Sequence, residues 1–282
     1  MTTLDPRLNA FRPDLADKRL LDQVESPSFV EPQRMQIIAP VIGVHKMPRF
    51  DAVQLTQALM GEVAKVFHTQ DGWAWVQLER DRYVGYVNCH ALSSAVTAPT
   101  HRVAVASTFL YAEPNLKTQP AIIVTLNAEV TVNGGDETFA RLSDGRFVFA
   151  NHLKPAGVVE PEFVAIAEMF LHTPYYWGGK TVHGLDCSGL VQVALEACGV
   201  ACPRDSDMQE KALGQPVPEN DLDALQRGDL VFWRNGHVGI MTDSATLLHA
   251  NGHHMMAVAE PLKDAVERIS RRYGEISSIK RL

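Results

Sequence analysis

Two successive series of strand-like segments fill residues 36–153 and limit the possible fold more than any other feature of the chain. The segments are short and rich in apolar residues, and Gly, Asp and Asn lie between them, as in strands joined by tight turns. The series resemble each other, because Leu92 closes the first and Leu153, 61 residues later, closes the second. We therefore expect two small all-β barrels; one larger β-sandwich is the alternative. The predicted strands are 36–44, 61–68, 73–78 and 83–87, then 102–107, 121–125, 129–132, 138–142 and 146–149.

Helical spacing replaces the strand-like segments near Pro161, which is well placed for the first turn of a helix. Helices followed by an antiparallel sheet predict an α+β domain. The expected helices are 161–171, a second one starting at Cys187, 205–213 and 263–272, and the expected strands are 229–233, 237–241, 246–250 and 276–281. The proline-interrupted start of the chain predicts an arm, with a short helix at 14–24. The predicted domains are the arm 1–34, a first barrel 35–97, a second barrel 98–158 and the α+β domain 159–282.

The net charge of −7, with no Lys/Arg run, argues against nucleic acid as a partner. The first residues show neither a basic nor an apolar signal region, and no apolar stretch approaches membrane-spanning length, so we expect no membrane association. The four cysteines do not form a disulfide pattern, although Cys198 and Cys202 would fit a pair or half a metal site. We expect reduced thiols, no metal, no cofactor, a cytoplasmic location and a monomer.

Cys187 stands at the predicted start of a helix, where free N–H groups and the helix dipole favour a thiolate. A small buried thiol without chemistry is the alternative. A nucleophilic thiol needs a base and a group that orients the base. His237 and His249 lie on predicted neighbouring strands, so a hairpin would bring their rings together, and His249 would fix the tautomer of His237. Each histidine taken alone is also compatible with an ordinary structural role.

Several motifs occur in one order: Pro174-Tyr-Tyr-Trp-Gly-Gly, Leu185-Asp-Cys-Ser-Gly, Pro203-Arg-Asp-Ser, Arg227-Gly-Asp-Leu-Val-Phe-Trp, His237-Val-Gly-Ile and His249-Ala. This series resembles the NlpC-type cysteine peptidases of bacterial cell-wall peptides, whose domain has a papain-like α+β fold. The two barrels resemble the bacterial SH3-like domains that precede the peptidase in the family's recycling branch, the γ-D-glutamyl-L-diamino acid endopeptidases (dipeptidyl-peptidase VI-like). The run Leu55-Thr-Gln-Ala-Leu-Met-Gly-Glu62 supports that branch.

The resemblance implies a role for individual residues. Cys187 would be the nucleophile, His237 the general base and His249 the orienting residue. The Cys187 N–H and the Tyr175 hydroxyl, with Tyr176 as the rival, would hold the oxyanion. The implied contacts of a substrate amine are Asp186, Glu62 and Tyr86 or Tyr83, and those of its carboxylates are Ser188, Arg204 and Ser206. Asp186 is also a favoured helix cap, and Arg204 also fits a surface charge.

The implied reaction is hydrolysis of the bond between γ-D-glutamate and diaminopimelate or lysine in short peptidoglycan stem peptides. These peptides carry a free N-terminal L-alanine, and the implied process is murein peptide recycling. The barrels would restrict the substrate to short peptides with an unblocked amine. The alternatives are a hydrolase of intact cell wall with wall-binding barrels, a non-catalytic peptide-binding protein, and a thiol acyltransferase.

Overall fold

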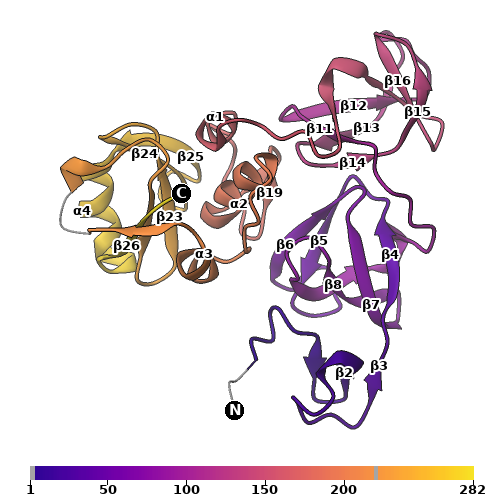
Figure 1. The fold of residues 1–282 in the computed structure, drawn as a ribbon, viewed down its shortest axis with the longest axis horizontal. Helices are drawn as coiled ribbons and strands as arrows, with labels where there is room; N and C mark the ends of the chain where they lie inside the picture. Colours follow the sequence, from indigo (N-terminus) through magenta and orange to yellow (C-terminus); the bar gives the residue numbers. More distant parts are fainter. Residues whose placement is uncertain (1–3, 219–221) are drawn as a thin grey trace. The chain divides into compact units, whose positions relative to one another are not determined.

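The computed structural model describes residues 4–218 and 222–282 and divides into two compact units, Met1–Ala156 and Gly157–Leu282 (Figure 1). Residues 1–3 of the predicted arm lie outside the described residues. Each unit has its own hydrophobic core and is described by itself below.

The N-terminal arm packs on the first β core of its own unit. Ala10 and Leu15 are buried in a cluster with Phe67, Trp75 and Val84. The predicted helix at 14–24 is wrong: the segment forms a short strand and one 3-10 turn, which the Asp17 carboxylate caps by accepting from the Arg19 N–H (2.9 Å). Its few leucines are used for contact with the barrel and do not form a helical stripe. The elements are β1 Phe11–Arg12, β2 Leu15–Asp17, η1 Lys18–Leu20 and β3 Phe29–Val30.

The first β core is a seven-stranded sheet of order β10-β4-β7-β8-β9-β5-β6. The predicted strand 36–44 is two strands, because the chain turns at Pro40, and the strand at 54–59 was not predicted. Strand 73–78 has the predicted bounds. The strands are β4 Gln33–Ile37, β5 Val41–His45, β6 Gln54–Leu59, β7 Val63–Gln70, β8 Trp73–Leu78, β9 Val84–Asn88 and β10 Leu92–Ser93, with the 3-10 turn η2 Cys89–Ala91.

The second β core has a five-stranded sheet of order β13-β12-β17-β16-β15 and a three-stranded sheet of order β14-β11-β18. Both cores end with a strand, a 3-10 turn and a short strand, and this shared ending agrees with the repeat seen in the sequence. The elements are β11 His101–Val103, β12 Ser107–Tyr111, β13 Pro120–Thr125, β14 Glu129–Val130, β15 Val132–Gly135, β16 Phe139–Leu142, β17 Phe147–Phe149, η3 Ala150–His152 and β18 Leu153–Pro155.

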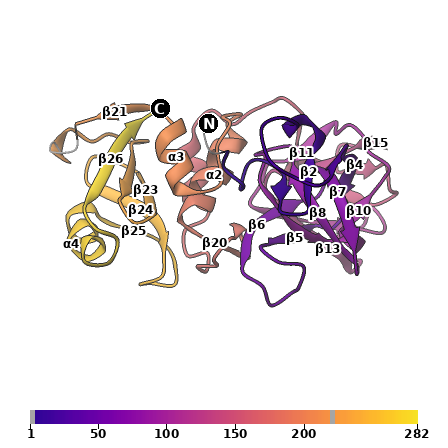
Figure 2. The same ribbon diagram turned by 90° about the horizontal axis from the view of Figure 1, so that it is seen from below.

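The C-terminal unit is a mixed helix and antiparallel sheet domain, as predicted. Its six-stranded sheet has the order β21-β26-β22-β23-β24-β25. Helices α1 and α2 lie on one face and α4 on the other (Figure 1), and the second view shows the same layers, with α3 beside α2 (Figure 2). The helices are α1 Phe163–Glu168, α2 Cys187–Ala197, α3 Ser206–Ala212 and α4 Leu262–Tyr273.

The structure contains the four strands predicted for this unit, and it adds short strands at 180–181, 184–185 and 215–217 that were not predicted. Strands 237–241 and 276–281 have the predicted bounds, whereas the strand after His249 was not predicted. The elements are β19 Lys180–Thr181, β20 Gly184–Leu185, β21 Gln215–Val217, η4 Leu222–Ala224, β22 Leu230–Trp233, β23 His237–Met241, β24 Thr246–Asn251, β25 Met256–Pro261 and β26 Ile276–Arg281.

Candidate active site

Cys187 is the first residue of α2 and is buried in the C-terminal unit. Asp186 caps the helix by accepting from the Gly189 N–H (2.7 Å), so the chain changes from extended to helical at the cysteine. Position 189 requires glycine, because a Cβ there would lie 2.2 Å from the Gly179 carbonyl oxygen. The motif Asp-Cys-Ser-Gly therefore combines a cap, a thiol and a close approach of two backbone segments.

A buried hydrogen-bond network beneath the start of α2 joins Asp186 and Arg204, and it includes the helix cap expected for Asp186. The Asp186 carboxylate accepts from Arg204 Nη1 (2.9 Å) and Nη2 (2.8 Å), from the Gly178 (2.8 Å) and Gly189 N–H groups, and from the Ser188 hydroxyl (3.3 Å). Five donors fill the roughly four lone-pair positions of a carboxylate. A substrate amine would have to displace one of them.

Arg204 and Ser188 are likewise engaged within the protein. Arg204 is 1% exposed, and its guanidinium also donates to the Ser188 Oγ (2.8 Å) and to the Gly179 carbonyl (3.2 Å). The surface-charge alternative for Arg204 is therefore wrong, and its polar face is directed at Asp186 rather than at a ligand. Asp186, Ser188 and Arg204 thus support the start of the helix that carries Cys187, and their contacts with a substrate stay predictions.

The electrostatics of Cys187 differ from the sequence expectation of an easily ionised thiol. Burial and the neighbouring Asp186 carboxylate raise the pKa of Cys187 to about 12. The Val238 N–H, the Arg204 charge and the Ser188 N–H lower it, but their effect is smaller. A helix start favours a thiolate, yet here removal of water outweighs it.

His237 and His249 lie on adjacent strands and face each other, as the hairpin predicted. β23 pairs with β24 in antiparallel fashion, and the His237 Nε2 lies 2.8 Å from the His249 Nδ1. Gly239 lets β24 approach closely, because a Cβ there would lie 2.6 Å from the Leu247 Cδ1 and 3.2 Å from the His249 Cβ. Both rings are buried, and burial is the main reason why the pKa of His237 falls to about 3 and that of His249 is also lowered.

Glu260 and Arg268 extend this pair and were missed from the sequence. The Glu260 Oε1 lies 2.6 Å from the His249 Nε2, and Arg268 binds both Glu260 oxygens, with Nη1 2.7 Å from Oε2. Burial opposes ionisation of Glu260, but His249 and Arg268 outweigh it and lower its pKa to about 2. β25 pairs with β24 and places Glu260 diagonally across from His249. A strand predicted after His249 would have pointed to this carboxylate.

Two aromatic rings complete the surroundings of His237: Trp233, which ends the motif that begins at Arg227, and Tyr273, which was not predicted from the sequence. Tyr273, at the end of α4, stacks on the imidazole with ring centroids 5.4 Å apart and an interplanar angle of 29°. Trp233 contacts the same imidazole at 5.4 Å in a tilted arrangement. The ring of His237 is thus held by packing as well as by its bond to His249.

Of the two candidate tyrosines, Tyr175 lies within the electrostatic reach of the nucleophile. Burial raises the pKa of the Tyr175 hydroxyl, and the charges of Cys187 and Asp186 raise it further. Tyr176 is 48% exposed, and its Cβ packs against Gly184. Ser206 starts α3 and lies close to Gly236, directly before His237.

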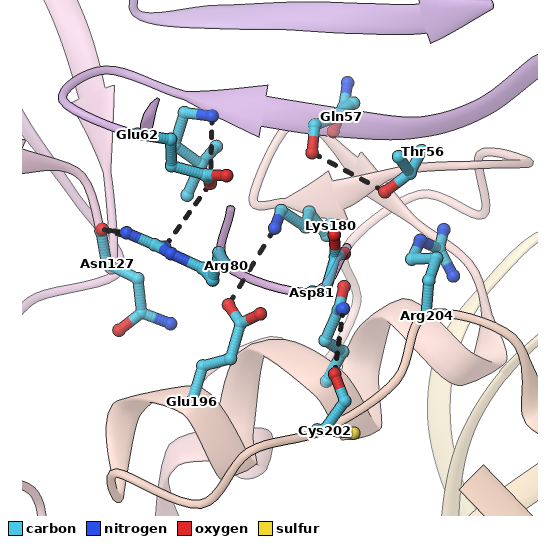
Figure 3. A network of polar contacts seen from close by, with 12 residues as sticks. Thr56, Gln57, Glu62, Arg80, Asp81, Asn127, Lys180, Glu196, Cys202 and Arg204 are labelled. Atoms are coloured by element: carbon cyan, nitrogen blue, oxygen red, sulfur yellow. Dashed lines mark hydrogen bonds and ion pairs between the residues drawn. The ribbon is translucent and has the colours of Figure 1, made fainter. Parts of the chain in front are cut away.

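Glu62 and Tyr86 belong to the N-terminal unit, and their contact with a substrate stays a prediction. The Glu62 Oε1 accepts from the Leu59 N–H (3.1 Å) and lies 3.4 Å from Arg80 Nη1 (Figure 3). Arg80 also donates to the Asn127 carbonyl (3.3 Å). The Tyr86 hydroxyl accepts from Arg12 Nη1 (3.2 Å).

The four cysteines are free thiols, including Cys198 and Cys202. In residues 4–218 and 222–282, His, Cys, Asp and Glu side chains do not gather in groups of three that could hold a metal ion. Among the same residues, no helix has both the length and the apolar character needed to cross a bilayer.

Known proteins share both the domains and the fold. Residues 172–273 match the NlpC/P60 family, and residues 44–92 match the bacterial dipeptidyl-peptidase Sh3 domain. The chain is 25% identical over 240 residues to Dipeptidyl-peptidase 6 of Lysinibacillus sphaericus, covering 76% of this chain and 86% of that protein. It is 29% identical over 225 residues to Gamma-D-glutamyl-L-lysine dipeptidyl-peptidase of Bacillus subtilis (strain 168), covering 71% and 73%.

A solved structure supports the fold. The crystal structure of an NlpC/P60 family protein from Bacillus cereus matches with a TM-score of 0.73 at 20% identity, covering 88% of this chain and 99% of that one. The assignment of residues 98–158 as a second SH3-like domain stays a prediction. The chain thus contains a bacterial dipeptidyl-peptidase SH3 domain followed by an NlpC/P60 domain, and these domains make it a cysteine peptidase, a hydrolase.

Proposed function

We propose that this peptidase hydrolyses the bond between γ-D-glutamate and the following diamino acid in peptidoglycan-derived peptides with a free N-terminal L-alanine. The observation that carries the proposal is the His237–His249 contact of 2.8 Å beside a helix that begins at Cys187. This arrangement supplies a nucleophile, a base and an orienting group, the three parts that thiol-dependent acyl transfer needs. We include the γ-glutamyl specificity because two relatives are named Gamma-D-glutamyl-L-lysine dipeptidyl-peptidase.

The proposed reaction uses each group in turn. His237 uses Nε2 to contact His249, so Nδ1 is the nitrogen that takes the thiol proton of Cys187. The sulfur attacks the γ-carbonyl carbon of glutamate, and the oxyanion is received by the Cys187 N–H and the Tyr175 hydroxyl. Collapse breaks the C–N bond as His237 protonates the leaving amine. Water activated by His237 then hydrolyses the thioester and restores the thiol.

Recognition of the free amine requires acceptors, because a buried ammonium without partners is unfavourable. The oxygens of Asp186 already hold five donors, so we assign this task to Glu62 and Tyr86 of the N-terminal unit. Ser206, next to the turn before His237, is the remaining candidate for a substrate carboxylate.

A free L-alanine amine arises only after a stem peptide has been released from the glycan strand, and for this reason the proposal includes a role in murein peptide recycling. We propose that it works in the cytoplasm as a monomer on short peptides. Four free thiols in one chain agree with a reducing compartment.

One mass-spectrometric digest tests the proposal. The substrates are L-Ala-γ-D-Glu-diaminopimelate, its lysine analogue, the N-acetylated form of each and intact wall. We expect cleavage of at least one free peptide between glutamate and the diamino acid, and little of the acetylated forms. Equal turnover of free and acetylated peptides would refute the amine requirement, and release from wall alone would favour a wall hydrolase. C187A, the matched control, should cleave none of them.

A further inference from the structure

Two side chains of opposite hydrogen-bonding character face the same nitrogen of His249. The Glu260 Oε1, an acceptor, lies 2.6 Å from Nε2, and the Asn251 Nδ2, a donor, lies 3.1 Å from the same atom. A neutral imidazole nitrogen either carries a proton and donates or has a lone pair and accepts. His249 therefore satisfies one of these neighbours at a time.

The tautomer of His249 determines the tautomer of His237, because the two rings share a hydrogen bond of 2.8 Å. With Glu260 as partner, His249 Nε2 is protonated, its Nδ1 accepts from the His237 Nε2–H, and Nδ1 of His237 has a lone pair. With Asn251 as partner, every proton in the chain shifts: His249 donates from Nδ1, His237 accepts at Nε2, and its Nδ1 carries a proton. The second arrangement cannot take a proton from a thiol.

The structure shows why both neighbours keep their orientation. The Asn251 Oδ1 accepts from the N–H groups of His253 (3.0 Å) and His254 (2.8 Å), so its amide nitrogen is turned toward His249. Arg268 holds both oxygens of Glu260, and Glu260 stays ionised because this pairing and His249 lower its pKa. A charged acceptor at 2.6 Å outweighs a neutral donor at 3.1 Å.

We propose that Glu260 is a positioning residue that selects the Nε2–H tautomer of both histidines, and that Asn251 stabilises the opposite, inactive tautomer when Glu260 is absent. The proposal rests on the proposed function only in giving His237 Nδ1 the role of base. The tautomers themselves can be measured without any substrate.

The kinetic experiment compares E260A, N251A and the double variant with the wild type on the free tripeptide. We expect kcat of E260A to fall by roughly 10²–10³-fold, less than the loss of about 10⁴-fold for a wrong tautomer at a serine protease triad, with KM within about twofold. N251A should stay within about threefold of the wild type, because Glu260 still sets the tautomer. The double variant should exceed E260A by about tenfold, since the competing donor is gone. E267A is the matched control on α4, because the Glu267–Arg271 pair is exposed and touches neither histidine.

The spectroscopic experiment uses long-range proton–nitrogen NMR spectra of protein with ¹⁵N-labelled histidine. In the wild type we expect both His237 and His249 to be protonated at Nε2 and bare at Nδ1, and E260A should reverse both. Protonation of wild-type His237 at Nδ1, or a double variant no faster than E260A, would overturn the proposal. If no variant or wild-type protein cleaves the tripeptide, the proposed function fails, while the spectra still decide the tautomers.

Discussion

Replacing Arg204 by methionine should destabilise the C-terminal unit strongly, because the change strands a buried carboxylate. Arg204 is 1% exposed and meets Asp186 through two contacts of 2.9 and 2.8 Å. Breaking one partner of a buried ion pair costs about 3–5 kcal/mol. Asp186 keeps the Gly178 and Gly189 N–H groups, so we expect the lower end, about 3 kcal/mol of unfolding free energy. A unit of this size would then lose roughly 10 °C in Tm.

Calorimetry of R204M and R227M tests whether burial makes the Asp186–Arg204 ion pair contribute more to stability than an exposed ion pair. Arg227 also binds two carboxylates, Glu162 at 2.9 Å and Glu168 at 2.7 Å, but it is 40% exposed, so its loss should cost about 1 kcal/mol or less. R204M/D186N should recover part of the stability, because the stranded charge is removed while an Asn cap remains. Equal losses in R204M and R227M would refute the reasoning.

Four further predictions concern titration and packing. The pKa of Glu162 is lowered because its arginine partner and two α1 amides outweigh burial, so E162A should cost about 1 kcal/mol above the unfolded pKa of about 4.3 and progressively less below it, as measured by urea unfolding at two pH values. The pKa of Glu260 is lowered to about 2, so its stabilisation is full above about pH 4.3 and disappears as the pH falls toward 2; thermal melts of E260Q should lack this acid dependence. Y273F should retain kcat, whereas Y273A should lower it by about tenfold, because stacking on His237 needs the ring and not the hydroxyl. Burial raises the pKa of Cys187 to about 12, so its alkylation by iodoacetamide should rise continuously from pH 7 to 10, and a rate already on a plateau at pH 7 would contradict a neutral resting thiol.

Local patterns made the catalytic hairpin predictable from the sequence. The short strand-like runs at His237 and Thr246 are separated by a turn. They bring His237 and His249 together only if the two strands pair, and the strands do pair. The start of α2 was similarly marked, because Asp, Ser and Gly around Cys187 are the residues that a capped helix entry requires. In both places the functional residues belong to one local structure, a hairpin or a helix start, and such local structures leave a pattern in the sequence.

Contacts that depend on tertiary burial could not be read in the same way. Arg204 looked like a substrate ligand or a surface charge, and only the fold shows that it is enclosed with Asp186. Glu260 lies on a strand of small residues after a His-rich turn, and Arg268 lies on an exposed-looking helix. Neither has a motif, because an ion pair across elements leaves no fixed spacing in the sequence.

The two ion pairs lead to one conclusion about the resting site. Asp186–Arg204 lies behind the nucleophile and Glu260–Arg268 lies behind the base, and each carboxylate is matched by a guanidinium. Neither pair therefore leaves a net negative charge that would stabilise an imidazolium, and Arg268 itself helps to lower the pKa of His237. Burial then decides the outcome: it raises the thiol pKa and lowers the imidazole pKa, which favours the neutral pair. The thiol proton should thus move to His237 as the sulfur attacks, when the developing oxyanion gains its own donors. For this step the correct tautomer of His237 matters more than a charged resting state. Glu260, which sets that tautomer through His249, is therefore as important as His249.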